Sequence, residues 1–260
     1  MEIIDLLFNK IDLFLVVLAR VSGVFQIAPI FAGERTPIYI RTGLAAIFSI
    51  LIAMVLPVSL DPIPQQLLPF ILGMAGEFIL GFAIGFIIYL VFVAVQVAGQ
   101  FIDMQMGFGI VNVLDPQSGI QMPLVGNFLY IIALLVFLSV NGHHLILTAL
   151  VKSYDFIPVM GFTYESGLTE IIIILFCGMF LTAMKIAVPV VITLVVTDIA
   201  LGLVARTVPQ MNVFIVGLPM KIMVGIFSLI TIMSIYVWVM TTLFSQVFDN
   251  VDLLFRLLSN

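Results

Sequence analysis

Long apolar stretches dominate this chain, and polar residues interrupt them without a regular alternation. Six stretches are long enough to cross a membrane, at residues of roughly 11–32, 42–60, 67–101, 124–151, 168–200 and 213–247. A helix needs about 20 apolar residues to cross a hydrocarbon core of about 30 Å. Because backbone in lipid must satisfy its own hydrogen bonds, and because these runs do not alternate, the pattern predicts helices rather than barrel strands.

The breaks between the stretches divide the predicted helices into four and two. Proline, glycine and aspartate mark the breaks, at residues 33–37, 61–64, 115–116, 158–161 and 209. Four stretches precede residue 160 and two follow it, so we expect a four-segment part and then a helical hairpin. Six alternating spans would place equal numbers of basic residues on the two sides, so the positive-inside rule leaves the orientation open.

The third stretch is longer than a membrane requires. Its roughly 35 residues would form a helix of about 52 Å at 1.5 Å per residue, against a hydrocarbon core of about 30 Å. The helix must therefore tilt, bend or project beyond the bilayer. Gly81 and Gly85 within it have the small-xxx-small spacing that lets helix backbones approach closely, although generic packing is the simpler interpretation.

Three polar residues follow one another along one face of the same helix. Gln96, Gln100 and Asp103 are separated by four and then three positions, so their side chains lie one above another. Exposing amides and a carboxylate to lipid costs several kcal/mol. We expect this polar stripe either to join an inter-helix hydrogen-bond network or to face a water-filled path or a polar partner.

The segment after the stripe, residues 104–123, lacks a helical pattern and is apolar. Connectors of about 20 residues usually carry function or are disordered, and the apolar content without Lys or Arg argues against disorder. An apolar loop favours burial against protein, and methionine suits a surface that seals and re-forms contacts. We expect either a movable plug or a static packed loop. The side chains expected to close a channel are Met106, Phe108, Ile110, Val111, Val113, Leu114 and Met122.

The composition identifies the class of protein. Of the 260 residues, 63% are hydrophobic and 9% are charged, whereas soluble domains have about 25% charged residues. So few charges exclude an ordinary soluble enzyme, a disordered chain and a nucleic-acid binder, which needs basic patches. The net charge of −5 offers no polybasic attraction to anionic lipid. The sequence therefore predicts an all-α, membrane-type protein of about six long hydrophobic helices.

Candidate chemistry is sparse. The sequence contains no P-loop, HExxH, GxSxG or CxxC motif, so we predict no catalytic residue, cofactor or metal site. His143 and His144 are adjacent and would point about 100° apart on a helix. That arrangement suits a helix-end or interfacial role better than a shared metal or a proton relay.

A few ionisable residues lie deep within the apolar stretches. Glu77 and Asp198 are the deepest carboxylates that we single out, and Lys185 is the deepest cation. Ionisable groups at such depth usually pair with one another or face a cavity. From depth alone we expect Glu77 to pair with Lys185, and Asp198 with Arg206. We predict that these four residues form ion pairs that stabilise the protein or its assembly.

One long stretch near the end of the chain resembles a known family. Residues 181–218 combine Lys185 and Pro189 with Leu201-Gly202-Leu203, Arg206, Pro209-Gln210 and Gly217. This combination is similar to the carboxy-terminal half of the FliR family of flagellar export-apparatus proteins. Residues 98–123, Asn141-Gly142-His143 and the stretch from Arg20 to Ala28-Pro29 resemble the same family, so the resemblance covers essentially the whole chain.

The resemblance implies a fold and a set of partners. Such proteins consist of a FliP-like part, expected here at 1–165, joined to a FliQ-like helical hairpin, expected at 166–260. They assemble with FliP-like and FliQ-like subunits, beside FlhB, in the type III export gate of the bacterial inner membrane, within the flagellar basal body. The gate passes unfolded flagellar subunits, and the family's plug matches residues 106–122 here. No enzymatic activity, cofactor or nucleic acid is implied.

Three other functions compete with this one. Virulence injectisomes contain homologous subunits. A secondary transporter of a small solute should show symmetric halves with matched broken helices, whereas this chain divides into four stretches and two. An intramembrane enzyme built on His143 or His144 would lack a nucleophile or a metal constellation to complete its site.

Overall fold

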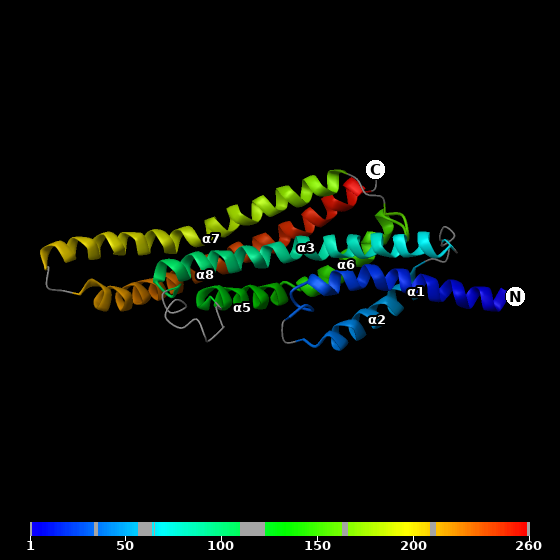
Figure 1. Cartoon of the computed structure of the whole chain (residues 1–260), viewed down its shortest axis with the longest axis horizontal. Helices are drawn as coiled ribbons and strands as arrows, with labels where there is room; N and C mark the ends of the chain where they lie inside the picture. Colours follow the sequence, from blue (N-terminus) through cyan, green and yellow to red (C-terminus); the bar gives the residue numbers. More distant parts are fainter. Residues whose placement is uncertain are drawn as a thin grey trace. The chain divides into compact units, whose positions relative to one another are not determined.

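The computed structural model is entirely helical in the part that it describes. This part comprises residues 2–33, 36–56, 64, 66–109, 123–162, 166–208 and 212–258. Seven helices and no strand are found in these residues (Figure 1): α1 (Glu2–Ile27), α2 (Ile38–Val55), α3 (Leu67–Met106), α5 (Leu124–Ser139), α6 (Gly142–Phe156), α7 (Ser166–Thr207) and α8 (Val213–Leu258). Helices α2, α3, α7 and α8 are each long and apolar enough to cross a membrane. The predicted all-α, membrane-type fold is confirmed.

The fourth predicted helix is in fact two. Instead of one helix over 124–151, α5 and α6 meet at an angle of 66°, so that the bent pair would count as a fifth span. The turn between them places Asn141 in the left-handed region, with φ of 57°. Asparagine tolerates this conformation better than other side-chain-bearing residues. This left-handed residue ends the helical path at a short polar break in the apolar stretch, the run from Ser139 to His144.

Helix α3 is longer than expected and shortens the loop that follows it. The helix continues to Met106, whereas the sequence pattern predicted an irregular loop from residue 104. Gly107 then adopts a φ of 91°, and the Phe108 N–H donates to the Asp103 carbonyl over 3.0 Å. This bond spans five residues and encloses a left-handed glycine, which is the Schellman motif that commonly ends helices.

The chain forms two compact units. The first comprises residues 1–90, 141–175 and 244–260, and the second comprises residues 91–140 and 176–243. Helices α3, α7 and α8 each contribute one part to each unit. These units are defined by contacts in space and do not coincide with the division at residue 165, which follows the resemblance and stays a prediction.

The core of the first unit depends on a close approach of α1 to α3. A Cβ atom on Gly81 would overlap the Arg20 carbonyl, and one on Gly23 would overlap the Phe78 carbonyl. Only glycine permits such contact between helix backbones. The buried side chains around this contact come from α1, α3, α6 and the last part of α8, and include Val17, Val21, Phe25, Leu80, Ile84, Ile88, Ile146, Leu150, Leu254 and Phe255.

The second unit has its own apolar core. Its buried side chains come from the second half of α3, from α5 and from parts of α7 and α8, and include Phe92, Val95, Ala98, Ile102, Leu129, Ala133, Phe137, Ala183, Ala187, Leu194 and Met240. Phe92 packs edge-on against Phe137, with ring centroids 5.5 Å apart. The Tyr236 hydroxyl of α8 donates to the Leu129 carbonyl of α5 over 2.8 Å, which satisfies a buried polar group.

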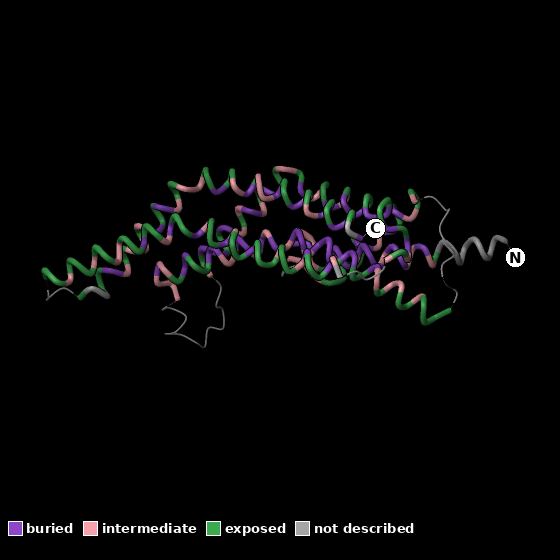
Figure 2. The backbone as a smooth tube through the Cα atoms, turned by 90° about the horizontal axis from the view of Figure 1, so that it is seen from above, coloured by how far each residue is buried: buried purple, intermediate pink, exposed green. Residues whose placement is uncertain are grey.

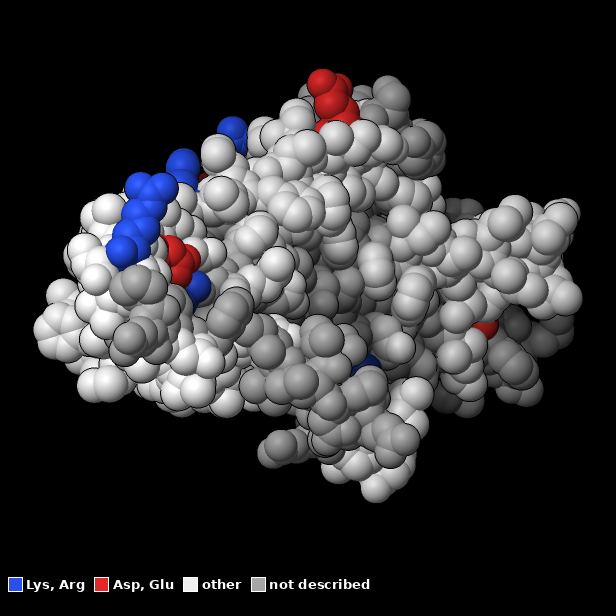
Figure 3. Space-filling model, turned by 60° about the vertical axis from the view of Figure 1, so that its left-hand side comes forward, with Lys and Arg blue, Asp and Glu red and all other residues white. Residues whose placement is uncertain are grey.

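Much of the apolar surface is left uncovered within the chain. In the most apolar windows of α7 and α8, only 28% and 17% of the residues are buried, and exposed residues recur along the tube in Figure 2. Charged side chains occupy only small areas of the face drawn in Figure 3. Soluble monomers rarely expose so much contiguous apolar surface, so this surface must face lipid or other proteins.

Candidate functional site

The two ends of the predicted plug segment meet at one buried carboxylate. Asp103, in the last turn of α3, is only 5% exposed. Its side chain accepts hydrogen bonds from the Val125 N–H, at 3.0 and 3.1 Å, and from the Gly126 N–H, at 3.2 Å. Both donors belong to the first turn of α5, where backbone N–H groups have no partner within the helix. We call Asp103, Val125 and Gly126 the loop base.

The sequence explains why a distant residue caps α5. Pro123 occupies the N-cap position, and no side chain makes a local capping bond there, because the proline ring carries no hydrogen-bonding group. The carboxylate of Asp103 replaces the missing cap, and its negative charge suits the positive end of the helix dipole. Gly99, one turn earlier on α3, lies against the Gly126 backbone so closely that a Cβ atom would overlap it. That contact brings the Asp103 carboxylate within hydrogen-bonding distance of the first turn of α5.

Two further contacts hold the last turn of α3 within the second unit. The Gln105 amide donates to the Asp198 carboxylate of α7 over 2.9 Å, and Lys221 of α8 pairs with the same carboxylate at 2.9 Å. Met106 is fully buried, and its thioether occupies the space that a Cβ atom on Gly225 would need. The end of α3 is therefore held by α5, α7 and α8 together.

Only the first residues of the predicted channel-closing set are described by the structure. Met106 is buried and Phe108 is half-buried. The other members lie outside the described residues, namely Ile110, Val111, Val113, Leu114 and Met122. The hypothesis of a plug therefore stays a prediction for the loop itself, while its two attachment points are defined.

The three residues of the predicted polar stripe differ in how far they are buried. Asp103 is buried and hydrogen-bonded within the chain, as the network interpretation expects. Gln96 is half-buried and Gln100 is exposed. Contact of this face with a water-filled path or a partner subunit stays a prediction, and Gln100 is the member placed to make it.

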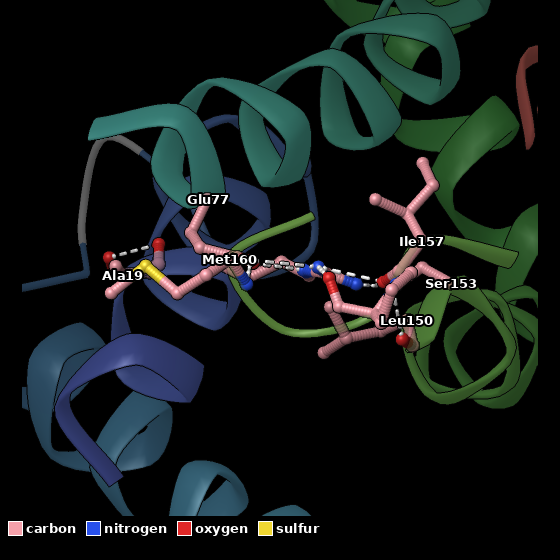
Figure 4. A network of polar contacts seen from close by, with 9 residues as sticks. Ala19, Glu77, Leu150, Ser153, Ile157 and Met160 are labelled. Atoms are coloured by element: carbon pink, nitrogen blue, oxygen red, sulfur yellow. Dashed lines mark hydrogen bonds and ion pairs between the residues drawn. The ribbon is translucent and has the colours of Figure 1, made fainter. Parts of the chain in front are cut away.

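A second polar cluster lies in the first unit, where Glu77 of α3 pairs with Arg20 of α1 (Figure 4). Both side chains are completely buried. The Arg20 Nη2 group donates to the Glu77 carboxylate over 3.0 Å, and its Nε group also donates to that carboxylate. The predicted pairing of Glu77 with Lys185 is therefore wrong. The contact of α1 with α3 at Gly81 places the arginine, rather than the lysine, opposite the glutamate.

Arg20 also contacts residues at the end of α6. Its guanidinium donates to the Ser153 hydroxyl over 2.9 Å and to the Ile157 carbonyl over 3.1 Å, and it lies 3.9 Å from the centroid of the Tyr154 ring. The Met160 N–H donates to Glu77 over 2.7 Å. One ion pair thus joins α1 and α3 to the end of α6 and to the turn that follows it, as Figure 4 shows. Arg20 lies near the centre of the apolar stretch 11–32, and this position is the signal that identifies it.

The second predicted ion pair is also replaced. Asp198 pairs with Lys221, and the predicted pairing with Arg206 is wrong. Lys221 lies on α8, which runs beside α7 after the turn, so it reaches the carboxylate directly. Arg206 and Lys185 are both exposed on α7. Their contribution to an assembly stays a prediction.

Among the described residues, no three His, Cys, Asp or Glu side chains are grouped so that they could hold a metal ion. His143 and His144 lie in the first turn of α6, beside the bend, with ring centroids 4.2 Å apart. This is the helix-end position that the sequence favoured. The polar clusters of both units therefore join helices to one another.

Comparison with known proteins gives consistent matches over most of the chain. The family model described as bacterial export proteins, family 1, matches residues 11–247. The flagellar biosynthetic protein FliR of Bacillus subtilis (strain 168) is 40% identical over 242 residues, which are 91% of this chain and 92% of that protein. The proteins of the same name from Escherichia coli (strain K12) and Aquifex aeolicus (strain VF5) are 32% and 30% identical, over 89% and 85% of this chain and 88% and 84% of their own lengths.

Proposed function

The chain belongs to the bacterial export proteins, family 1, as a FliR-type component of a flagellar export apparatus, and from this premise we propose that it helps to form and to close the export channel. In this proposal the chain contributes to the wall of the conduit for unfolded flagellar subunits. Its 106–122 loop closes the conduit when no subunit is in transit.

The observation that carries the proposal is the uncovered apolar surface of α7 and α8. These helices have 42 and 46 residues, and would extend about 63 and 69 Å at 1.5 Å per residue. A hydrocarbon core of about 30 Å covers less than half of that length. Exposed side chains such as Ile192, Leu203, Ile215 and Phe227 need a covering beyond the bilayer. We propose that FliP-like and FliQ-like subunits supply it, with FlhB as a further neighbour in the inner membrane at the flagellar basal body.

The loop base supports the closing role of the loop. The chain leaves α3 at Gly107 and returns at Pro123, and both attachment points are fixed by contacts inside the second unit. The loop sequence between them is apolar. Packing of such side chains excludes water, and contributes about 1.5–3 kcal/mol for each large side chain that is fully buried. A few contacts of this size suffice to keep a two-state gate shut.

Co-purification tests membership in the assembly. The chain is produced with and without FliP-like and FliQ-like subunits, and its particle size in detergent is measured. We expect a single defined particle only when the partners are present, because α7 and α8 are otherwise uncovered. A stable, monodisperse particle of this chain alone would contradict the proposal and would favour the alternative of a small-solute transporter.

A loop variant tests the closing role. Deleting Gly109 to Val113 removes part of the seal, so we expect the membrane to become permeable to small solutes while the partners still co-purify. A length-matched variant with Ile110, Val111 and Val113 replaced by serine separates the loss of apolar surface from the loss of length. An assembled complex whose membranes stay as tight as those of the parent would refute the role of the loop.

A further inference from the structure

A lysine in the middle of α7 indicates the chemistry of a partner subunit. We infer that the Lys185 ammonium group pairs with a carboxylate on an apolar helix of a different subunit, and that this helix packs along the exposed face of α7 around Lys185. The inference rests on the proposed membership of the chain in an export assembly, and adds which face of α7 is covered and what the covering helix must carry.

Lys185 lies near the centre of a long uncharged segment. Residues 171–197 contain no other Asp, Glu, Lys or Arg, and they extend about 40 Å at 1.5 Å per residue. Wherever a hydrocarbon core of about 30 Å is placed along this segment, the Lys185 backbone lies about 9 Å or more from either surface of the core. That depth is greater than the four-carbon stem of lysine extends, so the ammonium group does not reach water along the helix. Ionisable groups at such depth pair with one another or face a cavity.

The chain itself does not supply the partner. The Lys185 side chain is exposed, and neither of the ion pairs found among the described residues includes it. Pro189 lies four positions further along α7 and has no N–H, so the Lys185 carbonyl also lacks its regular helical donor. The same level of α7 therefore presents a cation and a carbonyl oxygen, and both favour a polar group on whatever covers this face.

The side chains around Lys185 indicate the kind of surface that covers it. Leu181, Val188 and Ile192 share its face of the helix, and they are 59%, 37% and 57% exposed. A water-filled path would leave these apolar side chains wet, whereas lipid would leave the ammonium group without a partner. An apolar helix that carries one Asp or Glu satisfies the apolar side chains and the charge together.

A second copy of this chain does not supply such a helix without losing an existing contact. The carboxylates that lie deepest in its apolar helices are already bonded: Glu77 and Asp198 are in ion pairs, and Asp103 caps α5. The carboxylate that meets Lys185 therefore belongs to a different subunit.

Charge variants in the full complex test the inference, in a flagellated host that lacks its own copy of this subunit. Lys185→Met removes the charge and keeps most of the volume, whereas Lys185→Arg keeps the charge. The control combines Lys185→Met with Ile192→Lys, which returns a cation to the same face about two turns away. The measurement is the recovery of partner subunits with the tagged chain, normalised to the amount of that chain in the membrane.

We expect Lys185→Met to lower the recovery at least tenfold, which corresponds to about 1.4 kcal/mol. Lys185→Arg should retain most of the recovery, and the displaced lysine should not restore it, because the partner carboxylate lies opposite position 185. Parent-like recovery for Lys185→Met would overturn the inference. Restoration by the displaced lysine would do the same, because any cation on this face would then suffice.

A photo-crosslink identifies the covering helix in a chain that keeps Lys185. A photoreactive residue in place of Ile192 should join this chain to another subunit, within a helix that contains an Asp or Glu. A crosslink to a second copy of this chain, or to lipid alone, would overturn the inference.

Exchange of the two charges then tests the pair itself. Lys185→Glu should abolish the recovery, and replacing the carboxylate of the cross-linked helix by lysine should restore it. Failure of that exchange would argue against direct pairing and so overturn the inference. The proposed function fails separately: in that case the parent chain itself recovers no partner subunits.

Discussion

The buried Arg20–Glu77 pair should dominate the stability of the first unit, and Arg20→Met tests this directly. Methionine keeps most of the volume of the arginine stem but removes every donor. The change takes from Glu77 its charged partner and takes hydrogen-bonding partners from Ser153 and the Ile157 carbonyl. Breaking a buried pair by removing one member costs about 3–5 kcal/mol, because an uncompensated charge stays in the interior.

That cost is large compared with the total stability of a folded domain, which is about 5–15 kcal/mol. We therefore expect Arg20→Met and Glu77→Gln each to lower the free energy of unfolding by about 3–5 kcal/mol. The double variant should cost at least about 2 kcal/mol less than the sum of the two, because neither charge is then left alone. Lys221→Met is the matched control: its pair with Asp198 is 18% and 42% exposed, and such pairs contribute about 1 kcal/mol or less.

Pulse proteolysis of the detergent-purified complex in increasing urea measures these differences as the fraction of chain that resists a brief exposure to protease. The reasoning would be refuted by Arg20→Met unfolding within about 1 kcal/mol of Lys221→Met. Strict additivity of the two single variants would also refute it, because the charges would then act independently.

Five other variants test three separate features of the chain. Gly81→Ala should lower the free energy of unfolding by about 1–3 kcal/mol through overpacking against the Arg20 backbone. Gly43→Ala, where no atom lies within 4 Å of the added carbon, should be neutral or stabilising in the same proteolysis assay, and equal costs would contradict the close approach of α1 and α3. Tyr236→Phe should cost about 0.5–1.5 kcal/mol by removing the buried bond to the Leu129 carbonyl, and an unchanged urea midpoint would argue against that bond. Arg206→Ala should reduce recovery of partner subunits more than Arg206→Lys, since the residue is exposed on α7; equal recovery and equal swimming would exclude an assembly role for its charge.

The sequence predicted a helix correctly where an apolar stretch is long and uninterrupted. The long third stretch is a single helix, α3. The free energy that its glycines cost through low helix propensity is smaller than the free energy gained by burying its apolar side chains. The break at Asn141 was missed although Asn141-Gly142 is a typical turn dipeptide, because the apolar residues on either side are together long enough to form one continuous helix. The end of α3 was placed too early, although Gly107 is a typical signal for the residue after a helix.

The polar contacts were harder to predict, because they depend on which helices meet. Depth within the apolar stretches suggested Lys185 as the ion-pair partner of Glu77. The close contact of α1 with α3 at Gly81 instead places Arg20 beside this carboxylate. Arg20 was not expected to pair with Glu77, although its central position in an apolar stretch could have identified it. Asp103 was recognised as an unusual carboxylate, whereas its role as the cap of α5 required knowing that α5 begins at a proline without a capping side chain.

The way in which the first unit is put together imposes an order on its biosynthesis. Arg20 leaves the ribosome 57 residues before Glu77 and 133 residues before Ser153. At about 5–20 residues per second, its charged partner follows about 3–11 s later. Until then the guanidinium must stay hydrated or bound to another group, so α1 can reach its final place only after α3. Because residues 244–260 also belong to this unit, the part of the protein that is synthesised first is completed only when the last turns of α8 have emerged.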